Sequence, residues 1–295
     1  MNEGNENAWI KAMPIVFVLI WSPGFIVARF GMPHSPPMKF LALRYALSIV
    51  CFLPWIVLAK VPWPNARLQY RHLAVTGVLM HACYLGGVWL AVKAGMGSGL
   101  ASLIVGLQPV LTAFWLSSTG GRVSQSQWLG LVLGFVGLLM VVSRKFGSGG
   151  EAHWLNMAFA IAALFGITIG TLYQKRFVAP CDVRTANVVQ LAAALLVTLP
   201  LTLLETEVMH WSVGLAGAMA WSVVALTLGG SSLLYLLIQR GAAAKVTSLM
   251  YLVPPTTALM AWLLFAEPIT ALTIAGTVIT AVGVSLVVRP ALRLA

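Results

Sequence analysis

Long apolar stretches separated by short polar connections run along the whole chain. A helix needs about 20 apolar residues to cross the hydrocarbon core of a bilayer, and ten of these stretches are near that length. The connections between them are too short to fold alone. The pattern therefore predicts ten transmembrane helices, at roughly residues 12–31, 38–59, 72–94, 97–117, 125–142, 154–176, 184–204, 213–239, 242–264 and 269–288.

Glycine and proline residues recur along the chain at a constant offset of 146 positions. Gly24 corresponds in this way to Gly170, and the other pairs are Pro54 and Pro200, Gly95 and Gly241, Pro109 and Pro255, Gly130 and Gly276, and Gly137 and Gly283. Matched helix breakers in two halves are typical of secondary transporters built from internal repeats. We therefore expect two five-helix repeats, residues 1–146 and 147–295. Because five is odd, the second repeat must be inverted in the membrane.

The composition supports a membrane location. Hydrophobic residues make up 60% of the 295 residues and charged residues only 8%, whereas soluble domains carry about 25% charged residues. One soluble core could not cover that much apolar surface, so lipid must cover much of it. The first stretch has the length of a retained span and a polar, weakly basic leader, which argues against a signal peptide. The fold class that follows is an all-α, multi-pass membrane protein.

Basic residues divide unequally between the two sides of this topology. Twelve of the 18 Lys and Arg residues lie on the side of the N-terminus, five lie on the other side, and Arg44 falls inside a span. The excess of Lys and Arg in cytoplasmic loops then predicts that both termini are cytoplasmic. The net charge of +11 has the same origin, because the basic residues are scattered over short loops near lipid headgroups. We expect membrane lipids as partners, and no nucleic acid.

Motifs for catalysis or metal binding are missing from the sequence. The three cysteines form no C-x-x-C pair, and there is no H-E-x-x-H and no phosphate-binding glycine loop. A membrane-embedded enzyme would need a nucleophile, a metal cluster or paired carboxylates at depth, and a structural scaffold would not need matched helix breaks. We therefore expect a transporter that uses no metal and no cofactor.

Polar side chains inside the apolar stretches are the candidates for a substrate site. His81 and Tyr84 lie midway along the third stretch, and their i, i+3 spacing places them on one helical face. An imidazole and a phenol at that depth can bind a polar substrate group or carry a proton. They can equally hold the bundle together through hydrogen bonds to a neighbouring helix. We favour Tyr84 as a wall of the cavity.

Breaks in the helices mark a second set of candidates. Pro109 in the fourth stretch leaves backbone carbonyl groups without partners, and Gln108 beside it can offer an amide to a ligand or to another helix. The ninth stretch contains a similar proline break, Pro254-Pro255, one turn after Tyr251. The first stretch is interrupted after Trp21. The residues that we predict as hinges are Pro23, Gly24, Pro109, Pro254 and Pro255.

The predicted cavity lies between the two halves, near the middle of the membrane. We expect the first, third, fourth, sixth, eighth and ninth stretches to line it, and Trp21 is deep enough to stack on a substrate. The predicted substrate-binding residues are Trp21, His81, Tyr84, Gln108, Thr168 and Tyr251. Arg44 in the second stretch can snorkel to the interface or act as a clasp between helices, and we favour the clasp over direct substrate contact.

Carboxylates at membrane depth are nearly absent, because all seven Asp and Glu residues lie in termini, loops or span ends. Ion-coupled carriers often keep an acidic residue at depth to hold the ion, and a strongly cationic substrate would need a buried counter-charge. We therefore expect a facilitator or an exchanger, with His81 as the group at mid-membrane that titrates near neutrality.

Several short motifs together resemble the drug/metabolite transporter superfamily, specifically its ten-helix EamA-type branch, over nearly the whole chain. These motifs are Trp21-Ser22-Pro23-Gly24-Phe25 followed by Arg29, Arg44, Gln108-Pro109 followed by Gly130 and Gly137, Pro254-Pro255, and Ala266-Glu267-Pro268-Ile269-Thr270 followed by Gly276 and Gly283. The family usually has a Glu before the last span of each half. Here the first half has Gly120-Gly121 at that place.

The resemblance implies an inner-membrane carrier whose two inverted repeats surround a central cavity and which moves small metabolites, commonly outward. Members similar to this chain include exporters of amino acids, aromatic ones among them. A cavity with aromatic walls and few charges suits neutral or aromatic amino acids. It equally suits the substrates of the alternative function, a multidrug exporter or an exporter of nucleobases or other metabolites with the same fold, proton-coupled or not.

Overall fold

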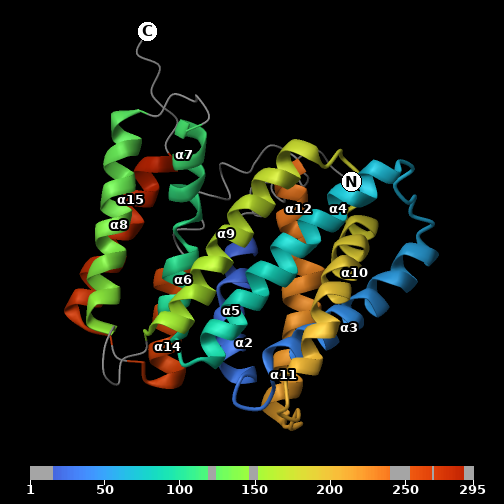
Figure 1. Ribbon diagram of the computed structural model, residues 1–295, viewed down its shortest axis with the longest axis horizontal. Coiled ribbons are helices and arrows are strands. Elements are labelled where there is room, and N and C mark those ends of the chain that lie inside the picture. Colours follow the sequence, from blue (N-terminus) through green and yellow to red (C-terminus); the bar gives the residue numbers. More distant parts are fainter. Residues whose placement is uncertain (1–15, 119–123, 146–151, 240–252, 268, 289–295) are drawn as a thin grey trace, which may run out of the picture.

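In the computed structural model, the described residues are 16–118, 124–145, 152–239, 253–267 and 269–288, and they form a bundle of helices with short connections (Figure 1). The first apolar helix covers Val16–Gly31 and has a one-residue turn at Ser22, after which α2 begins. The helices of the first half are α2 (Pro23–Gly31), α3 (Pro37–Leu58), α4 (Arg67–Gly77), η1 (Val78–Cys83), α5 (Tyr84–Lys93), α6 (Ser98–Val105), α7 (Gln108–Ser118) and α8 (Gln125–Lys145).

The second half repeats this order. Its helices are α9 (Trp154–Phe177), α10 (Val183–Leu201), η2 (Thr202–Leu204), α11 (Val213–Trp221), η3 (Ser222–Ser231), α12 (Ser232–Gln239), α14 (Val253–Phe265) and α15 (Ala271–Val288). The ranges 240–252 and 146–151 lie outside the described residues, and so does the proposed boundary between the repeats.

Ten apolar segments of the described chain correspond to the ten predicted spans. Six are long enough to cross a membrane, and four are shorter apolar helices, namely Val16–Gly31, Gln125–Val141, Val253–Phe265 and Ala271–Gly283. The third span begins at Arg67 rather than near residue 72, because a polar first turn extends it and Gln69 bonds the backbone of Ala179 at that end. The protein is therefore an all-α membrane protein.

The helices pair across the two halves. The second span (α3) packs on the seventh (α10), the fifth (α8) on the tenth (α15), and the fourth (α6) on the ninth (α14). The third span packs on the sixth through α5 and α9, and the first packs on the eighth through α2 and α11. Exchanging the halves converts the first–eighth and third–sixth pairs into each other and leaves the other three pairs unchanged. This arrangement is that of two inverted repeats that interlock.

Caps at the helix ends follow from local sequence. Ser212 accepts a hydrogen bond from the Leu215 backbone N–H at the start of α11, and Asp182 accepts one from the Arg184 N–H at the start of α10. The Arg184 side chain also bonds Asp182, and this bond holds the pKa of the Asp182 carboxyl below its usual value. Prolines begin α2 and α3, where the missing N–H needs no partner.

Two carboxylates from the second half cap helix N-termini of the first half at one end of the bundle. Glu205 accepts hydrogen bonds from the backbone N–H groups of Met38 (2.7 Å) and Lys39 (2.9 Å) at the start of α3. Glu267 accepts bonds from the backbone N–H and the hydroxyl of Ser98 (3.1 Å each) at the start of α6. We call these contacts the carboxylate clasps. They link the two halves at this end.

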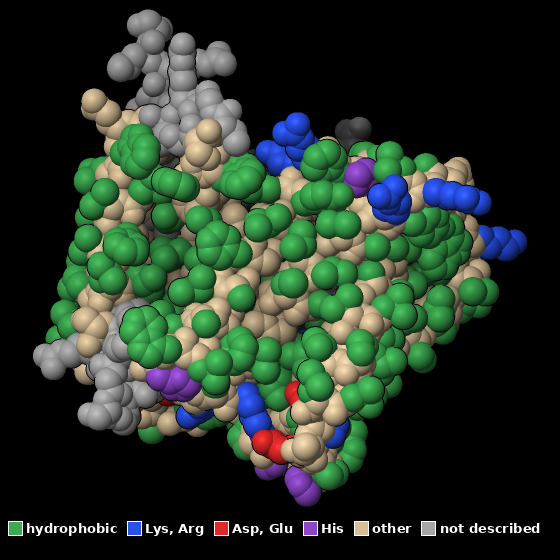
Figure 2. Space-filling view, in the orientation of Figure 1, with side chains coloured by type: hydrophobic (Ala, Val, Ile, Leu, Met, Phe, Trp, Pro, Cys, Tyr) green, Lys and Arg blue, Asp and Glu red, His purple; other side chains and the backbone are tan. Residues whose placement is uncertain are grey.

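An apolar belt surrounds the bundle. Figure 2 shows a face that is mainly hydrophobic across its middle, with basic residues and histidines gathered toward two opposite edges. Large side chains such as Leu58, Leu203 and Val213 are at least 83% exposed in the protein alone. Exposed apolar surface on this scale requires lipid around it, as the composition predicts.

Candidate functional site

A cavity lies in the middle of the bundle, with an empty volume of about 630 Å³ including the space at its mouth. Side chains from both halves line it. They come from the first, second, third, sixth, seventh and eighth spans, and they include Trp21, Gly24, Phe25, Arg44, Met80, His81, Tyr84, Leu85, Val88, Trp89, Gln174, Gln190, Leu226, Ser231, Leu234 and Tyr235. We expected the fourth and ninth spans to line the cavity, but the second and seventh spans line it instead. The reason is that α3 and α10 pack directly beside the third span.

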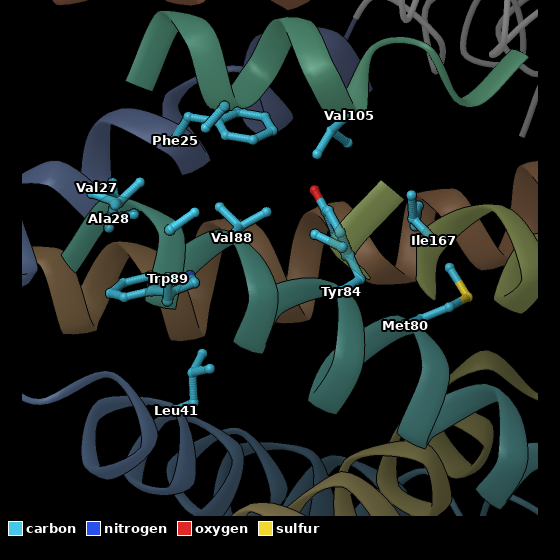
Figure 3. Packing of buried hydrophobic residues seen from close by; sticks show 14 of the residues in the cluster. Phe25, Val27, Ala28, Leu41, Met80, Tyr84, Val88, Trp89, Val105 and Ile167 are labelled. Atoms are coloured by element: carbon cyan, nitrogen blue, oxygen red, sulfur yellow. The ribbon is translucent and has the colours of Figure 1, made fainter. Parts of the chain in front are cut away.

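An aromatic pair forms one wall of this cavity. The rings of Trp21 and Tyr84 are parallel, with an interplanar angle of 4° and centroids 6.2 Å apart, and the Phe17 ring packs on Trp21 with centroids 4.9 Å apart. Tyr84 is 3% exposed and points away from its helix toward the side of Phe25 and Val105 (Figure 3). Trp89 extends this wall and stacks on Phe40. Such a wall offers a flat apolar surface to a ligand.

His81 lies on the same helix as Tyr84 and is also buried. Its backbone carbonyl accepts a hydrogen bond of 2.8 Å from the Tyr45 hydroxyl, and the Tyr45 ring meets the His81 ring edge-on. Gln190 of α10 lies against the imidazole. The structure therefore brings three of the predicted residues, Trp21, His81 and Tyr84, to one cavity.

Both halves carry a π-helical stretch at the cavity, a feature that we did not predict. The stretch η1 contains His81, and η3 contains Thr227, which is the residue 146 positions further along. The wider turns leave carbonyl groups that hydroxyls satisfy, for example from Thr227 to Ser222 and from Ser231 to Leu226. π-Helical turns are rare in proteins, and those that occur often lie at functional sites.

Arg44 reaches the cavity from α3 and is only 3% exposed, so it does not snorkel to the interface. Its Nε–H donates a 3.0 Å hydrogen bond to the Thr227 hydroxyl, which joins the two halves. None of the described acidic residues pairs with it: Asp182 pairs with Arg184, Glu205 and Glu267 form the carboxylate clasps, and Glu207 pairs with Lys93. The guanidinium group is thus both a clasp, as predicted, and a part of the cavity wall.

Two glutamines that we did not predict as site residues also line the cavity. Gln174 of α9 and Gln190 of α10 are 3% and 4% exposed. The side-chain Nε2 atom of each is buried without a hydrogen-bond partner in the described structure. Buried amide donors normally have partners, so these two are available to a ligand.

The other predicted residues lie elsewhere. Gln108 donates a 3.1 Å hydrogen bond to Thr171 and lines a separate pocket of about 250 Å³. Thr168 bonds the Leu164 carbonyl one turn back on its own helix and is not among the residues that line the central cavity. Tyr251 lies outside the described residues.

The helix breaks of three spans meet beside this second pocket. The fourth span is interrupted after Val105 and resumes at Gln108, with Pro109 in the first turn of α7. A Cβ atom added to Gly106 would lie 2.8 Å from Pro254 Cγ, so the broken part of the fourth span touches the start of α14, where Pro255 follows. Thr257 of α14 donates a hydrogen bond to the Ser22 carbonyl, just before Pro23 and Gly24. Trp21 and Phe25 line both cavities and separate them.

Two interlocked repeats around a buried polar and aromatic cavity define a membrane transporter. The EamA-like transporter family model matches residues 8–143 and again residues 154–289, with an offset of 146, and the chain belongs to this family.

Relatives of this chain carry transporter names. The uncharacterized inner membrane transporter YedA of Escherichia coli K12 is 25% identical over 245 residues, which cover 82% of this chain and 78% of that protein. A probable amino-acid metabolite efflux pump of Salmonella typhimurium LT2 is 24% identical over 285 residues, 92% of each chain. A solved crystal structure shares the fold, with a TM-score of 0.68 and 16% identity over 93% of this chain and 95% of its own. The protein is a multi-pass inner-membrane transporter.

Proposed function

We propose that the protein exports small amphipathic metabolites, neutral and aromatic amino acids among them, by alternating access through the central cavity. The observation that carries this proposal is the composition of the cavity wall, which joins the aromatic surface of Trp21 and Tyr84 to a few polar groups. A relative described as a probable amino-acid metabolite efflux pump supports the same substrate class. A multidrug or nucleobase exporter remains the alternative, since an aromatic wall binds such molecules equally well.

Counterflow of labelled amino acids in proteoliposomes tests the proposal. We expect exchange of an aromatic amino acid in the absence of any ion gradient. The Tyr84→Ala variant should exchange substrate about tenfold more slowly, because it lacks the ring that stacks on Trp21. The amount of folded protein in the membrane should not change. Tyr70→Ala is the matched control, since Tyr70 is a half-buried tyrosine of α4 outside the cavity wall.

A further arm of this assay tests energy coupling. We expect a facilitator or exchanger, so a pH gradient alone should change net uptake only modestly. The opposite result, in which a pH gradient drives accumulation and His81→Gln abolishes accumulation but keeps counterflow, would make the protein a proton-coupled carrier with His81 as the coupling residue. Equal exchange of nucleobases or cationic drugs in place of amino acids would favour the alternative function.

We also propose that both termini face the cytoplasm, on the strength of the unequal division of Lys and Arg. The clasped end of the bundle then faces the periplasm. Cysteine introduced at Ser148 in a cysteine-free background should react with an impermeant thiol reagent added to intact cells. Reaction only after lysis would reverse the orientation.

A further inference from the structure

The cavity wall contains a positive charge that has no counter-charge among the described residues. Arg44 is buried in the wall, and no acidic residue of the described chain lines the cavity or pairs with the guanidinium. A buried charge is costly unless it is paired and hydrogen-bonded. The wall thus lacks one negative group, which a ligand can supply.

The guanidinium group is held in a fixed orientation. Its Nε–H bonds the Thr227 hydroxyl at 3.0 Å, and that hydroxyl in turn donates a 2.8 Å bond to the Ser222 carbonyl. Within the described residues, the Nε–H bond to Thr227 is the one hydrogen bond of the Arg44 guanidinium. Its two terminal NH₂ groups make no hydrogen bond to these residues. A guanidinium fork of this kind binds the two oxygens of a carboxylate side by side.

Two further donors share the cavity with Arg44. The Nε2 atoms of Gln174 and Gln190 are buried and lack partners in the described structure, although the Gln190 side chain also meets the His81 imidazole, and the two residues come from different helices. Arginine and both amides are hydrogen-bond donors that need acceptor oxygens. A carboxylate offers about four acceptor positions, which matches this set better than a neutral group does.

We propose that Arg44, Gln174 and Gln190 form a carboxylate-binding subsite, and that the substrate is an organic acid with an aromatic or aliphatic body. The body lies against the apolar wall of Trp21 and Phe25. The inference rests on the proposed transport through this cavity and narrows its substrate class. An ammonium group finds no acidic partner among the described residues of the wall, so the carboxylate and not the amine dominates recognition.

Equilibrium binding to the purified protein in detergent tests the subsite without any transport step. Three ligands share one aromatic body: 3-phenylpropionate carries only the carboxylate, L-phenylalanine carries both groups, and phenethylamine carries only the amine. We expect 3-phenylpropionate and L-phenylalanine to bind at least tenfold more tightly than phenethylamine. The ratio between the first two identifies the free acid or the amino acid as the preferred source of the carboxylate.

Variants assign the effect to the subsite. Arg44→Lys keeps the charge but removes the fork, and Gln174→Leu removes one unpartnered donor without leaving another buried polar group unpaired. Each should weaken binding of the two carboxylates tenfold or more and change phenethylamine binding less than threefold. Arg176→Met, which removes an exposed cation at the end of α9, should leave all three affinities unchanged.

Equal losses for all three ligands, or tightest binding of phenethylamine by the wild-type protein, overturn the subsite. If Arg44→Lys does not fold, Gln174→Leu alone decides, because that change is at a donor that no described group satisfies. Carboxylate binding that depends on these residues in a protein without amino-acid counterflow would reject the proposed export of amino acids but uphold the subsite. Counterflow with no carboxylate preference would do the reverse.

Discussion

Replacing Gly276 or Gly283 with alanine is expected to destabilise the folded protein by about 1–3 kcal/mol each, the usual cost of overfilling a packed interface. A Cβ atom at Gly276 would lie 2.6 Å from the Gly137 carbonyl oxygen, and one at Gly283 would lie 2.5 Å from the Gly134 nitrogen. Both neighbours are backbone atoms and cannot move aside without separating the helices. Small residues of this kind let two transmembrane helices approach closely.

The effect should be large because α8 and α15 depend mainly on each other. They lie together at the left of Figure 1, and their outer faces carry exposed Phe135 and Val278. The measurement is the fraction of monodisperse protein that remains after heating in detergent. Gly217→Ala is the control, because the added Cβ would meet no atom within 4 Å on an exposed helical surface. Equal melting temperatures for Gly276→Ala and Gly217→Ala would show that the crossing tolerates separation.

The sequence predicted the helices and their two-fold repetition well because glycine and proline act on the backbone locally. Pro109 interrupts the fourth span wherever that span packs, since the missing N–H and the ring are properties of the residue itself. Trp21 and Tyr84 could be selected because each combines an aromatic ring with a polar atom deep in a span, and both line the cavity.

The sequence could not predict in the same way which polar side chains point into the cavity. Gln174 and Gln190 line the cavity while Gln108 bonds Thr171, although all three are glutamines within apolar spans. Which face a span turns inward depends on its partner helices, and the π-helical stretch η1 changes that face within the third span. Thr168 satisfies its hydroxyl on its own helix, an alternative that is open to any threonine in a span.

Removing the carboxylate clasps is expected to open the clasped end of the transporter. The positions that correspond to Glu205 and Glu267 in the first half are Ala59 and Gly121, so the sequence provides these two carboxylates at one end only. Ala266, which precedes Glu267, has a φ of 52°, a backbone conformation that is unfavourable for alanine and that the fold maintains at this contact. The clasps should therefore favour the state that is closed toward the proposed periplasmic side.

The size of the shift follows from the loss of charge at these bonds, because a glutamine oxygen can still accept a hydrogen bond but carries no charge. A hydrogen bond to a charged group contributes about 1.5–3 kcal/mol and a neutral one about 0.5–1.5 kcal/mol, and about 1.4 kcal/mol is a tenfold change in an equilibrium. Glu205→Gln combined with Glu267→Gln should thus raise the population open to the periplasm by tenfold or more. Ser231→Cys in a cysteine-free background places a thiol in the cavity wall, and its rate of reaction with an impermeant maleimide added outside intact cells reports that population.

A matched acidic residue at the same end separates the clasps from a general effect of charge. Glu207 pairs with Lys93 and has a side chain that is 60% exposed, so water screens this ion pair and Glu207→Gln should change the reaction rate less than about threefold. An exporter that rests closed toward the periplasm loads its substrate from the cytoplasm, and the double variant should lose this preference while keeping the cavity intact. If the double variant reacts no faster than Glu207→Gln, the carboxylates only cap their helices and do not set the resting state.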